Sequence, residues 1–205
     1  MTKGTLFAYK VDSGVYINMT NRCTNCCTFC IRNNGDGAYG TDTLWLEHEP
    51  STGEIISAVK ALCSDSTSEL VFCGYGEPTE RLSDMISVAQ ELKRLYPKMP
   101  IRVNTNGQAD LICGCDTSES FGIFDKVSVS LNAPSSEKYE QLCRSKYRGK
   151  AFNAMLEFAD NVNKRFHNVV FSVVKEMLDD DELKQCFQIA NELSIPLRVR
   201  DYISE

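Results

Sequence analysis

The sequence has only two histidines, His48 and His167, and no uninterrupted apolar run near the ~20 residues that a membrane-spanning helix needs. Basic residues are also in the minority, since 22 Lys and Arg stand against 28 Asp and Glu and leave a net charge of −6. This charge gives no indication of binding to nucleic acid or to anionic membranes. No hydrophobic signal segment follows Met1, so we expect a cytoplasmic protein.

Cysteine, by contrast, is abundant, with 10 residues in a chain of 205. In a reducing compartment a disulfide framework is disfavoured, so metal ligation becomes the favoured interpretation. Four of the cysteines crowd into one short segment: Cys23, Cys26, Cys27 and Cys30. Cys113 and Cys115 are the other close pair, and the remaining cysteines are expected to be small core residues. Segment 23–30 is therefore the candidate metal site.

Two ligand sets can be drawn from this segment. Pairing Cys23 with Cys26 and Cys27 with Cys30 would give four thiolates for zinc, but zinc sites of this kind normally place roughly a dozen or more residues between the pairs. Taking Cys23, Cys27 and Cys30, with Cys26 as a bystander, gives three thiolates for a [4Fe–4S] cluster whose fourth iron stays open. An open metal position is where a cofactor or substrate can coordinate. We favour the three-cysteine set, with structural zinc or redox-active thiols as the alternatives.

Short apolar alternations, separated by helical stretches, describe the fold. Six strands are predicted, at Val15–Thr20, Glu69–Gly74, Ile101–Thr105, Lys126–Asn132, Asn168–Val174 and Leu197–Tyr202. A further strand, Thr5–Lys10, is expected to form a hairpin with the first across Asp12-Ser13-Gly14. Ser51 and Glu54 form a capping box that opens the first helix. Helices are predicted at residues 52–63, 82–96, 136–143, 151–166 and 180–193, with one short helix in the irregular connection 108–124.

Strands that alternate with helices indicate parallel βαβ units, and no linker divides the chain, so we expect a single domain over residues 1–205. Most strands carry polar residues on one face, such as Arg102 and Asn104, or Ser128 and Ser130. A sheet covered on both faces should be apolar throughout. The pattern fits an open sheet with one wet face or a barrel with a polar lumen, and a complete eight-stranded barrel needs about 250 residues. We therefore predict an α/β fold, a six-stranded parallel partial (βα)6 barrel with an N-terminal β-hairpin strand.

The cysteine spacing resembles the signature of the radical S-adenosylmethionine (SAM) superfamily. Cys23-x3-Cys27-x2-Cys30 directly follows the first strand, and Phe29 supplies the aromatic residue that precedes the third cysteine of the signature. The turn Gly74-Tyr75-Gly76-Glu77-Pro78 is similar to the superfamily's Gly-Gly-Glu-Pro motif, although Tyr75 separates the glycines. The resemblance implies a partial barrel of the radical SAM type with a [4Fe–4S] cluster on the three cysteines and SAM on the open iron. It also implies that the turn holds the amino group of SAM, which Glu77 can pair as an ammonium.

Polar side chains near the ends of later strands are similar to those that contact the ribose and carboxylate of SAM in this superfamily. They are Asn104, Thr105, Asn106, Ser130, Asn132, Ser172 and Arg200. For the Asn and Ser residues, capping of strand ends is the alternative. Arg198 and Arg200 share the inward face of the last strand and are expected to bind an anion of SAM or substrate, or else a carboxylate such as Glu176.

The connection Ile31–Leu44 is long for a strand-to-helix connection, and we expect it to cover the cluster and SAM. A solvent-exposed linker is the alternative. The substrate candidates, from this connection and from the last strand, are Arg32, Tyr39, Arg198 and Tyr202.

The resemblance implies an enzyme in which the reduced cluster cleaves SAM to a 5′-deoxyadenosyl radical that abstracts hydrogen from a substrate. An external one-electron reductant of the flavodoxin or ferredoxin type would be needed. More narrowly, residues 16–23 and 74–79 resemble the small radical SAM proteins associated with TatD-type hydrolases, which suggests a functional link to such a hydrolase.

Three substrate classes are open. A small-molecule or nucleotide-like substrate leads, followed by activation of a glycyl-radical enzyme and by peptide modification. Peptide modification is expected less because the chain ends at Glu205, directly after the last predicted strand, without a cysteine-rich extension. An iron–sulfur electron carrier or a structural metal protein is the non-enzymatic alternative.

Overall fold

The computed structural model describes residues 2–203, which build one seven-stranded sheet in the order β1-β2-β3-β4-β5-β6-β7. The strands are β1 (Ala8–Val11), β2 (Gly14–Ile17), β3 (Glu69–Phe72), β4 (Ile101–Thr105), β5 (Lys126–Ser130), β6 (Val169–Val174) and β7 (Leu197–Arg200). β1 pairs antiparallel with β2, and every later strand is parallel to its predecessor. The six parallel strands and the N-terminal hairpin are confirmed.

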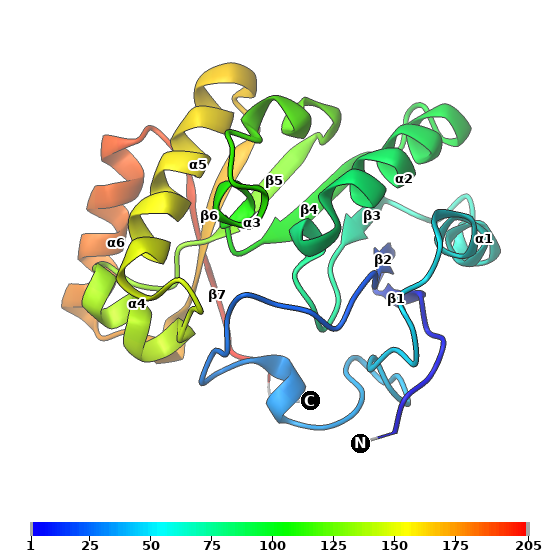
Figure 1. The fold of residues 1–205 in the computed structure, drawn as a ribbon, viewed down its shortest axis with the longest axis horizontal. Helices are drawn as coiled ribbons and strands as arrows, with labels where there is room; N and C mark the ends of the chain where they lie inside the picture. Colours follow the sequence, from blue (N-terminus) through cyan, green and yellow to red (C-terminus); the bar gives the residue numbers. More distant parts are fainter. Residues whose placement is uncertain (1, 204–205) are drawn as a thin grey trace.

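The helices alternate with these strands. They are α1 (Thr52–Leu62), α2 (Leu82–Leu95), α3 (Ala109–Cys113), α4 (Ser136–Cys143), α5 (Ala151–Phe166) and α6 (Asp180–Glu192), with 3-10 turns η1 (Ile31–Asn33), η2 (Pro78–Arg81), η3 (Ser118–Ile123), η4 (Arg148–Lys150) and η5 (Lys175–Met177). Figure 1 shows the helices along the outer side of the curved sheet, while the long segment between β2 and α1 crosses the opposite side. Among the described residues, no helix is both long and apolar enough to cross a membrane.

Local sequence signals explain where several helices begin. At α1 the Glu54 amide donates to Ser51 Oγ at 3.3 Å, and the Ser51 amide donates to Glu54 Oε2 at 2.8 Å, so the predicted capping box is present. Asp179 and Glu182 form a second capping box at α6. These caps satisfy amide groups that a helix leaves unpaired in its first turn.

The apolar face of the sheet and the helices build one core. Its largest fully buried strand and helix residues include Ile17, Phe72, Phe171, Met85 and Phe158. The opposite face carries the polar residues seen in the strand patterns, so one face packs and the other stays wet. A curved parallel sheet that is covered on its outer side and polar inside is a partial barrel, as predicted.

Four strands, β2, β3, β5 and β7, end earlier than predicted, whereas β4 and β6 end at the predicted residue. β2 stops at Ile17 rather than Thr20, and Asn18 and Thr20 are buried away from the lumen, where Asn18 Nδ2 donates to the Leu44 carbonyl at 2.8 Å. β5 stops at Ser130, and Asn132 takes a left-handed conformation with φ of 57°. The alternation of apolar and polar residues reflects which side chains are buried. It can continue past the last hydrogen bond between neighbouring strands, so it overestimates strand length. Some residues that follow the strand ends, such as Asn132 after β5, line the cavity described below.

Candidate active site

A cavity of about 450 Å³ lies on the polar face of the sheet, at the C-terminal ends of the strands. This volume falls within the ~300–1,000 Å³ of small-molecule sites. Every predicted site residue lines the cavity except Arg32 and Pro78. The polar lumen expected from the strand patterns is therefore a real cavity, and the motifs that are far apart in sequence meet in its wall.

The cysteine segment forms part of that wall. Cys23, Cys27 and Cys30 line the cavity, whereas Cys26 is exposed and outside it. The segment is docked on the C-terminus of α4, because the Cys26 amide donates to the Cys143 carbonyl at 3.0 Å and the Thr28 amide donates to the Leu142 carbonyl at 2.8 Å. Within residues 2–203, no three or more His, Cys, Asp or Glu side chains converge on a single metal-ion position.

A buried polar network supports the segment from beneath, and no residue pattern had indicated it. Gln108 Nε2 donates to Asn25 Oδ1 at 2.8 Å and to the Tyr139 hydroxyl at 3.0 Å. Asn25 Nδ2 donates to the same hydroxyl at 3.2 Å, and Ser145 Oγ donates to Gln108 Oε1 at 2.9 Å. The four residues are buried, so a lost partner would leave a polar atom unsatisfied in a low-dielectric interior. The network fixes the backbone between Cys23 and Cys27.

Asn106, predicted as a SAM contact, is engaged by its own chain. Its Nδ2 donates to Thr24 Oγ1 at 2.7 Å and lies 3.9 Å from Cys23 Sγ. Its Oδ1 accepts from the Gln108 amide at 3.0 Å. The side chain thus ties the end of β4 to the cysteine segment while it faces the cavity.

Glu77 is a fully buried carboxylate at the centre of the site. Its Oε1 accepts from Thr105 Oγ1 at 2.7 Å, and from the Thr79 hydroxyl and amide at 2.8 and 3.1 Å. Its Oε2 accepts from the Asn106 amide at 2.7 Å. Burial raises the pKa of Glu77, and these donors oppose the rise. Because a carboxylate has about four acceptor positions, two per oxygen, Oε2 keeps one that can take an ammonium.

Gly74 and Gly76 are required by close packing against the strand that leads to the cysteines. A Cβ at Gly76 would collide with the Thr20 carbonyl oxygen and would lie 2.6 Å from the Arg22 carbonyl oxygen. A Cβ at Gly74 would collide with the Asn18 side chain. The Glu77 amide donates to the same Arg22 carbonyl at 2.7 Å. The glycines therefore set the distance between the two motifs.

The three cavity cysteines are neutral thiols in the absence of metal. Burial raises the pKa of Cys23 to about 12, and it also raises that of Cys30. For Cys27 the pKa rises because its thiol contacts the Cys143 thiol and is buried. Metal binding must therefore displace their protons.

The cavity contains two kinds of arginine. Arg102, at the floor, pairs with Glu69 at 2.7 Å and donates to Asn104 Oδ1 at 2.8 Å. No carboxylate pairs with Arg198 or Arg200 anywhere in residues 2–203. The alternative pairing with Glu176 is wrong. Glu176 Oε2 instead accepts a hydrogen bond from the backbone amide of Tyr202 at 2.8 Å.

Segment 31–44 lies against the cavity as expected of a cover. Ile31 and Tyr39 line the cavity, and Tyr75 donates its hydroxyl hydrogen to the Gly35 carbonyl at 3.1 Å. Asn34 contacts the chain after β7. The segment therefore bridges from the turn after β3 to the last strand.

Two predicted residues have other roles. Arg32 lies outside the cavity, because η1 turns its side chain toward the cysteine segment. Its guanidinium donates to the Asn25 carbonyl at 3.2 Å, and its Cζ lies 5.9 Å from the centroid of the Trp45 ring. Pro78 is buried as the first residue of η2, where its missing amide is tolerated. Cavity residues that were not predicted include Tyr16, Cys73, Arg102, Ser128 and Asp201. Three of these, Tyr16, Arg102 and Ser128, lie on the polar strand faces, and that alternation was the signal that could have found them.

A family model of the radical SAM superfamily matches residues 17–190. The chain belongs to this superfamily. The radical SAM superfamily uses a [4Fe–4S] cluster and SAM, and these are the two cofactors that membership gives this chain.

Known proteins resemble this radical SAM enzyme at low identity. The probable dual-specificity RNA methyltransferase RlmN of Bifidobacterium longum is 24% identical over 90% of the chain and 49% of its own length, so the chain spans about half of that relative. A radical SAM methyltransferase from Sphaerobacter thermophilus superimposes with a TM-score of 0.60 at 16% identity, over 95% of this chain and 68% of that one. Streptococcus suis SuiB, solved with its precursor peptide SuiA, gives a TM-score of 0.68 at 17% identity, over 91% of this chain and 38% of SuiB. These structures support the fold.

Proposed function

We propose that Cys23, Cys27 and Cys30 hold the [4Fe–4S] cluster and that SAM binds at its open iron. One observation carries the proposal: the cysteine segment and the Gly74–Pro78 turn meet in the wall of a single cavity. The donor set fits the cluster, because three thiols from one loop face the cavity and Cys26 does not.

The cavity also offers the polar groups that SAM needs. We propose that the Gly74–Pro78 turn binds the methionine amino group and that the open acceptor position of Glu77 Oε2 takes one of its hydrogens. Asn132 is 4% exposed, and its Oδ1 is buried without a partner, so it can accept a hydrogen from a ribose hydroxyl or an adenine amine. Ser130 and Ser172 lie beside it in register on β5 and β6. An acceptor without a partner in the cavity wall supports a bound donor at this place.

A [4Fe–4S] cluster held by Cys23, Cys27 and Cys30, and SAM held by the Gly74–Pro78 turn, would supply radical chemistry that removes a hydrogen atom from the substrate. The chain's own residues orient and shield this chemistry. The Gln108–Tyr139–Asn25 network holds the cysteine segment, and segment 31–44 limits the entry of water. No charged acid or base in the wall is needed for hydrogen-atom transfer.

We infer a small-molecule or nucleotide-like substrate. The cover formed by segment 31–44, which lines the cavity through Ile31 and Tyr39, supports a small substrate that enters whole. Activation of a glycyl-radical enzyme and peptide modification would both need a chain segment to pass this cover. They are the alternatives.

RNA is the second candidate substrate. The expectation that nucleic acid is excluded relied on a net charge of −6, which describes the whole surface and not the cavity. The relative named as an RNA methyltransferase is 24% identical, and this supports testing an RNA substrate.

We propose a single radical SAM domain over residues 1–205, because β1 to β7 form one continuous sheet. A cytoplasmic location is supported by the cysteines, all 10 of which are unpaired. A flavodoxin or ferredoxin would then be the reductant. The functional link to a TatD-type hydrolase stays a prediction.

The test is anaerobic reconstitution with iron and sulfide, followed by dithionite and SAM. We expect a brown protein that releases 5′-deoxyadenosine without added substrate. Cys23→Ser, Cys27→Ser and Cys30→Ser should lose the cluster absorbance and the product, while Cys26→Ser, the matched control from the same loop, should keep both. A wild-type protein that is brown and reducible but never cleaves SAM would contradict the proposal.

A further inference from the structure

The inner face of β7 carries two positive charges that nothing in the described chain neutralises. Arg198 and Arg200 are two residues apart on one strand, so their side chains leave the same face of the sheet, and both line the cavity. Arg198 lies in register with Ser172, another cavity residue, and Arg200 lies in register with Val174. Burial lowers the pKa of Arg200, and the charge of the neighbouring Arg198 acts in the same direction.

Two other arginines of the chain, Arg102 and Arg81, form ion pairs with acidic side chains. Arg102 faces the same cavity and is held by Glu69 at 2.7 Å. Arg81 pairs with Asp84 at 2.6 Å and donates to two backbone carbonyls. Asp201 and Glu77 also line the cavity, yet neither forms an ion pair with β7 among residues 2–203, and Glu77 is already bonded by other donors. Arg32, Arg144 and Arg148 also form no ion pair among residues 2–203, but they lie outside the cavity. Of the arginines that line the cavity, Arg198 and Arg200 have no acidic partner in the described chain.

SAM by itself does not supply the missing charge. Its sulfonium and ammonium groups carry two positive charges against one carboxylate, so bound SAM adds a net positive charge to the cavity. Its single carboxylate can serve one of the two arginines at most as a full partner. Arg200 is half-buried and Arg198 beside it is exposed, so an anion bound between them would offset the desolvation of Arg200 and their mutual repulsion.

We propose that Arg198 and Arg200 form an anion subsite that binds a phosphate or carboxylate group of the substrate while SAM is present. Guanidinium groups suit both ligands because they donate two parallel hydrogen bonds to such oxygens. Tyr16 and Tyr39 line the same cavity and give the rest of the substrate an aromatic wall. This inference rests on the proposed function and specifies its substrate class as an anionic small molecule.

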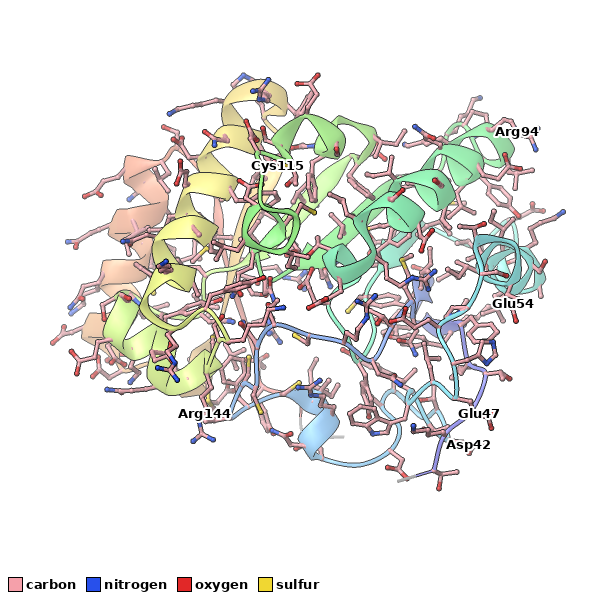
Figure 2. The ribbon with its side chains drawn as sticks, in the orientation of Figure 1. Asp42, Glu47, Glu54, Arg94, Cys115 and Arg144 are labelled. Atoms are coloured by element: carbon pink, nitrogen blue, oxygen red, sulfur yellow. The ribbon has the colours of Figure 1, made fainter. Side chains whose placement is uncertain are left out.

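The test titrates two probes, inorganic phosphate and succinate, into anaerobically reconstituted, SAM-saturated protein and follows heat by calorimetry. We expect at least one probe to bind, and the stronger one identifies the chemistry of the substrate's anion. Arg198→Ala should weaken that probe about ten- to hundredfold, the loss of a charge-assisted contact, and Arg198→Lys should weaken it less. Arg94→Ala is the matched control, because Arg94 pairs with Glu91 at the outer end of α2 (Figure 2) and should not affect binding.

Arg200→Ala should weaken the same probe as Arg198→Ala does, because both side chains belong to the proposed subsite. Three results overturn the proposal: neither probe binds, both arginine variants bind the probes as the wild type does, or the probes bind only when SAM is omitted. In the first case, binding of an RNA oligonucleotide would assign the substrate to that class instead. Cluster absorbance and SAM cleavage in the same samples report separately on the proposed function.

Discussion

Tyr202 donates its hydroxyl hydrogen to Asn34 Oδ1 at 2.9 Å, and Asn34 Nδ2 donates to the carbonyl of Ile203 at 3.0 Å. These two bonds join the chain after β7 to the segment that follows the cysteines. β1 and β7 are the edges of the sheet and do not pair with each other. The open side of the partial barrel is therefore spanned by side-chain contacts, and Tyr202, predicted as a substrate contact, anchors the cover as well as lining the cavity.

Replacing Tyr202 with phenylalanine should loosen this cover. The variant keeps the ring and loses one hydrogen bond, so we expect a stability loss of about 0.5–1.5 kcal/mol or less, since the bond is exposed. Amide hydrogen exchange should accelerate in residues 31–44. Tyr147→Phe is the control, because the Tyr147 hydroxyl donates to the Leu111 carbonyl at 3.0 Å, away from the cover. Equal exchange in residues 31–44 of both variants would contradict the anchoring role.

Gly76→Ala should separate the two cofactor motifs. The new Cβ would collide with the Thr20 carbonyl, and the backbone shift that relieves it should cost about 1–3 kcal/mol and reduce iron loading. Gly53→Ala, in α1 with nothing within 4 Å, should be neutral or stabilising by up to about 1 kcal/mol. Thermal unfolding and iron content measure both effects. A Gly76→Ala protein with wild-type iron content would refute the spacing role.

Glu77→Gln should destabilise the protein by about 1.5–3 kcal/mol at neutral pH, because an amide nitrogen replaces one acceptor oxygen of a buried carboxylate that already accepts hydrogen bonds on both oxygens. The raised pKa of Glu77 gives a sign for the pH dependence. The folded protein binds this proton at higher pH than the unfolded chain, so the associated stability is present below the unfolded value and is lost as pH rises through the folded pKa. The wild type should therefore gain stability over the variant as pH falls from neutral toward 4.5. A constant difference in denaturant unfolding would argue against it.

Thiol labelling should distinguish the cysteines before any metal is added. Iodoacetamide reacts with thiolates, and burial raises the pKa of Cys23 to about 12, so at pH 8 the exposed Cys26 and Cys115 should be labelled first. Labelling of Cys23 should accelerate as pH rises toward that pKa. After cluster loading, Cys23, Cys27 and Cys30 should be protected while Cys26 stays reactive. Peptide mass mapping reads each position, and protection of Cys26 would indicate a different ligand set.

The periodic parts of the fold were predictable from the sequence. Alternation of apolar and polar residues shows which face of each strand is buried, and the Ser51–Glu54 capping box shows where α1 begins. Both signals can be read from sequence because each depends only on residues that are close along the chain. Strand ends were not predictable in the same way. Thr20 and Asn132 continue the alternation but leave the sheet, because ladder hydrogen bonds depend on the partner strand.

The sequence alone determined which motifs this protein carries, since Cys23-x3-Cys27-x2-Cys30 and Gly74–Pro78 are each contiguous. Only the tertiary structure decided how their side chains are used. Arg102 and Arg200 look alike in the strand pattern, yet one pairs with Glu69 and the other has no acidic partner in the described chain. Likewise Gln108 is buried beneath the cysteines by contacts with Asn25 and Tyr139. Pairing energies depend on distance and burial, and these are fixed by which strands and helices the fold brings side by side.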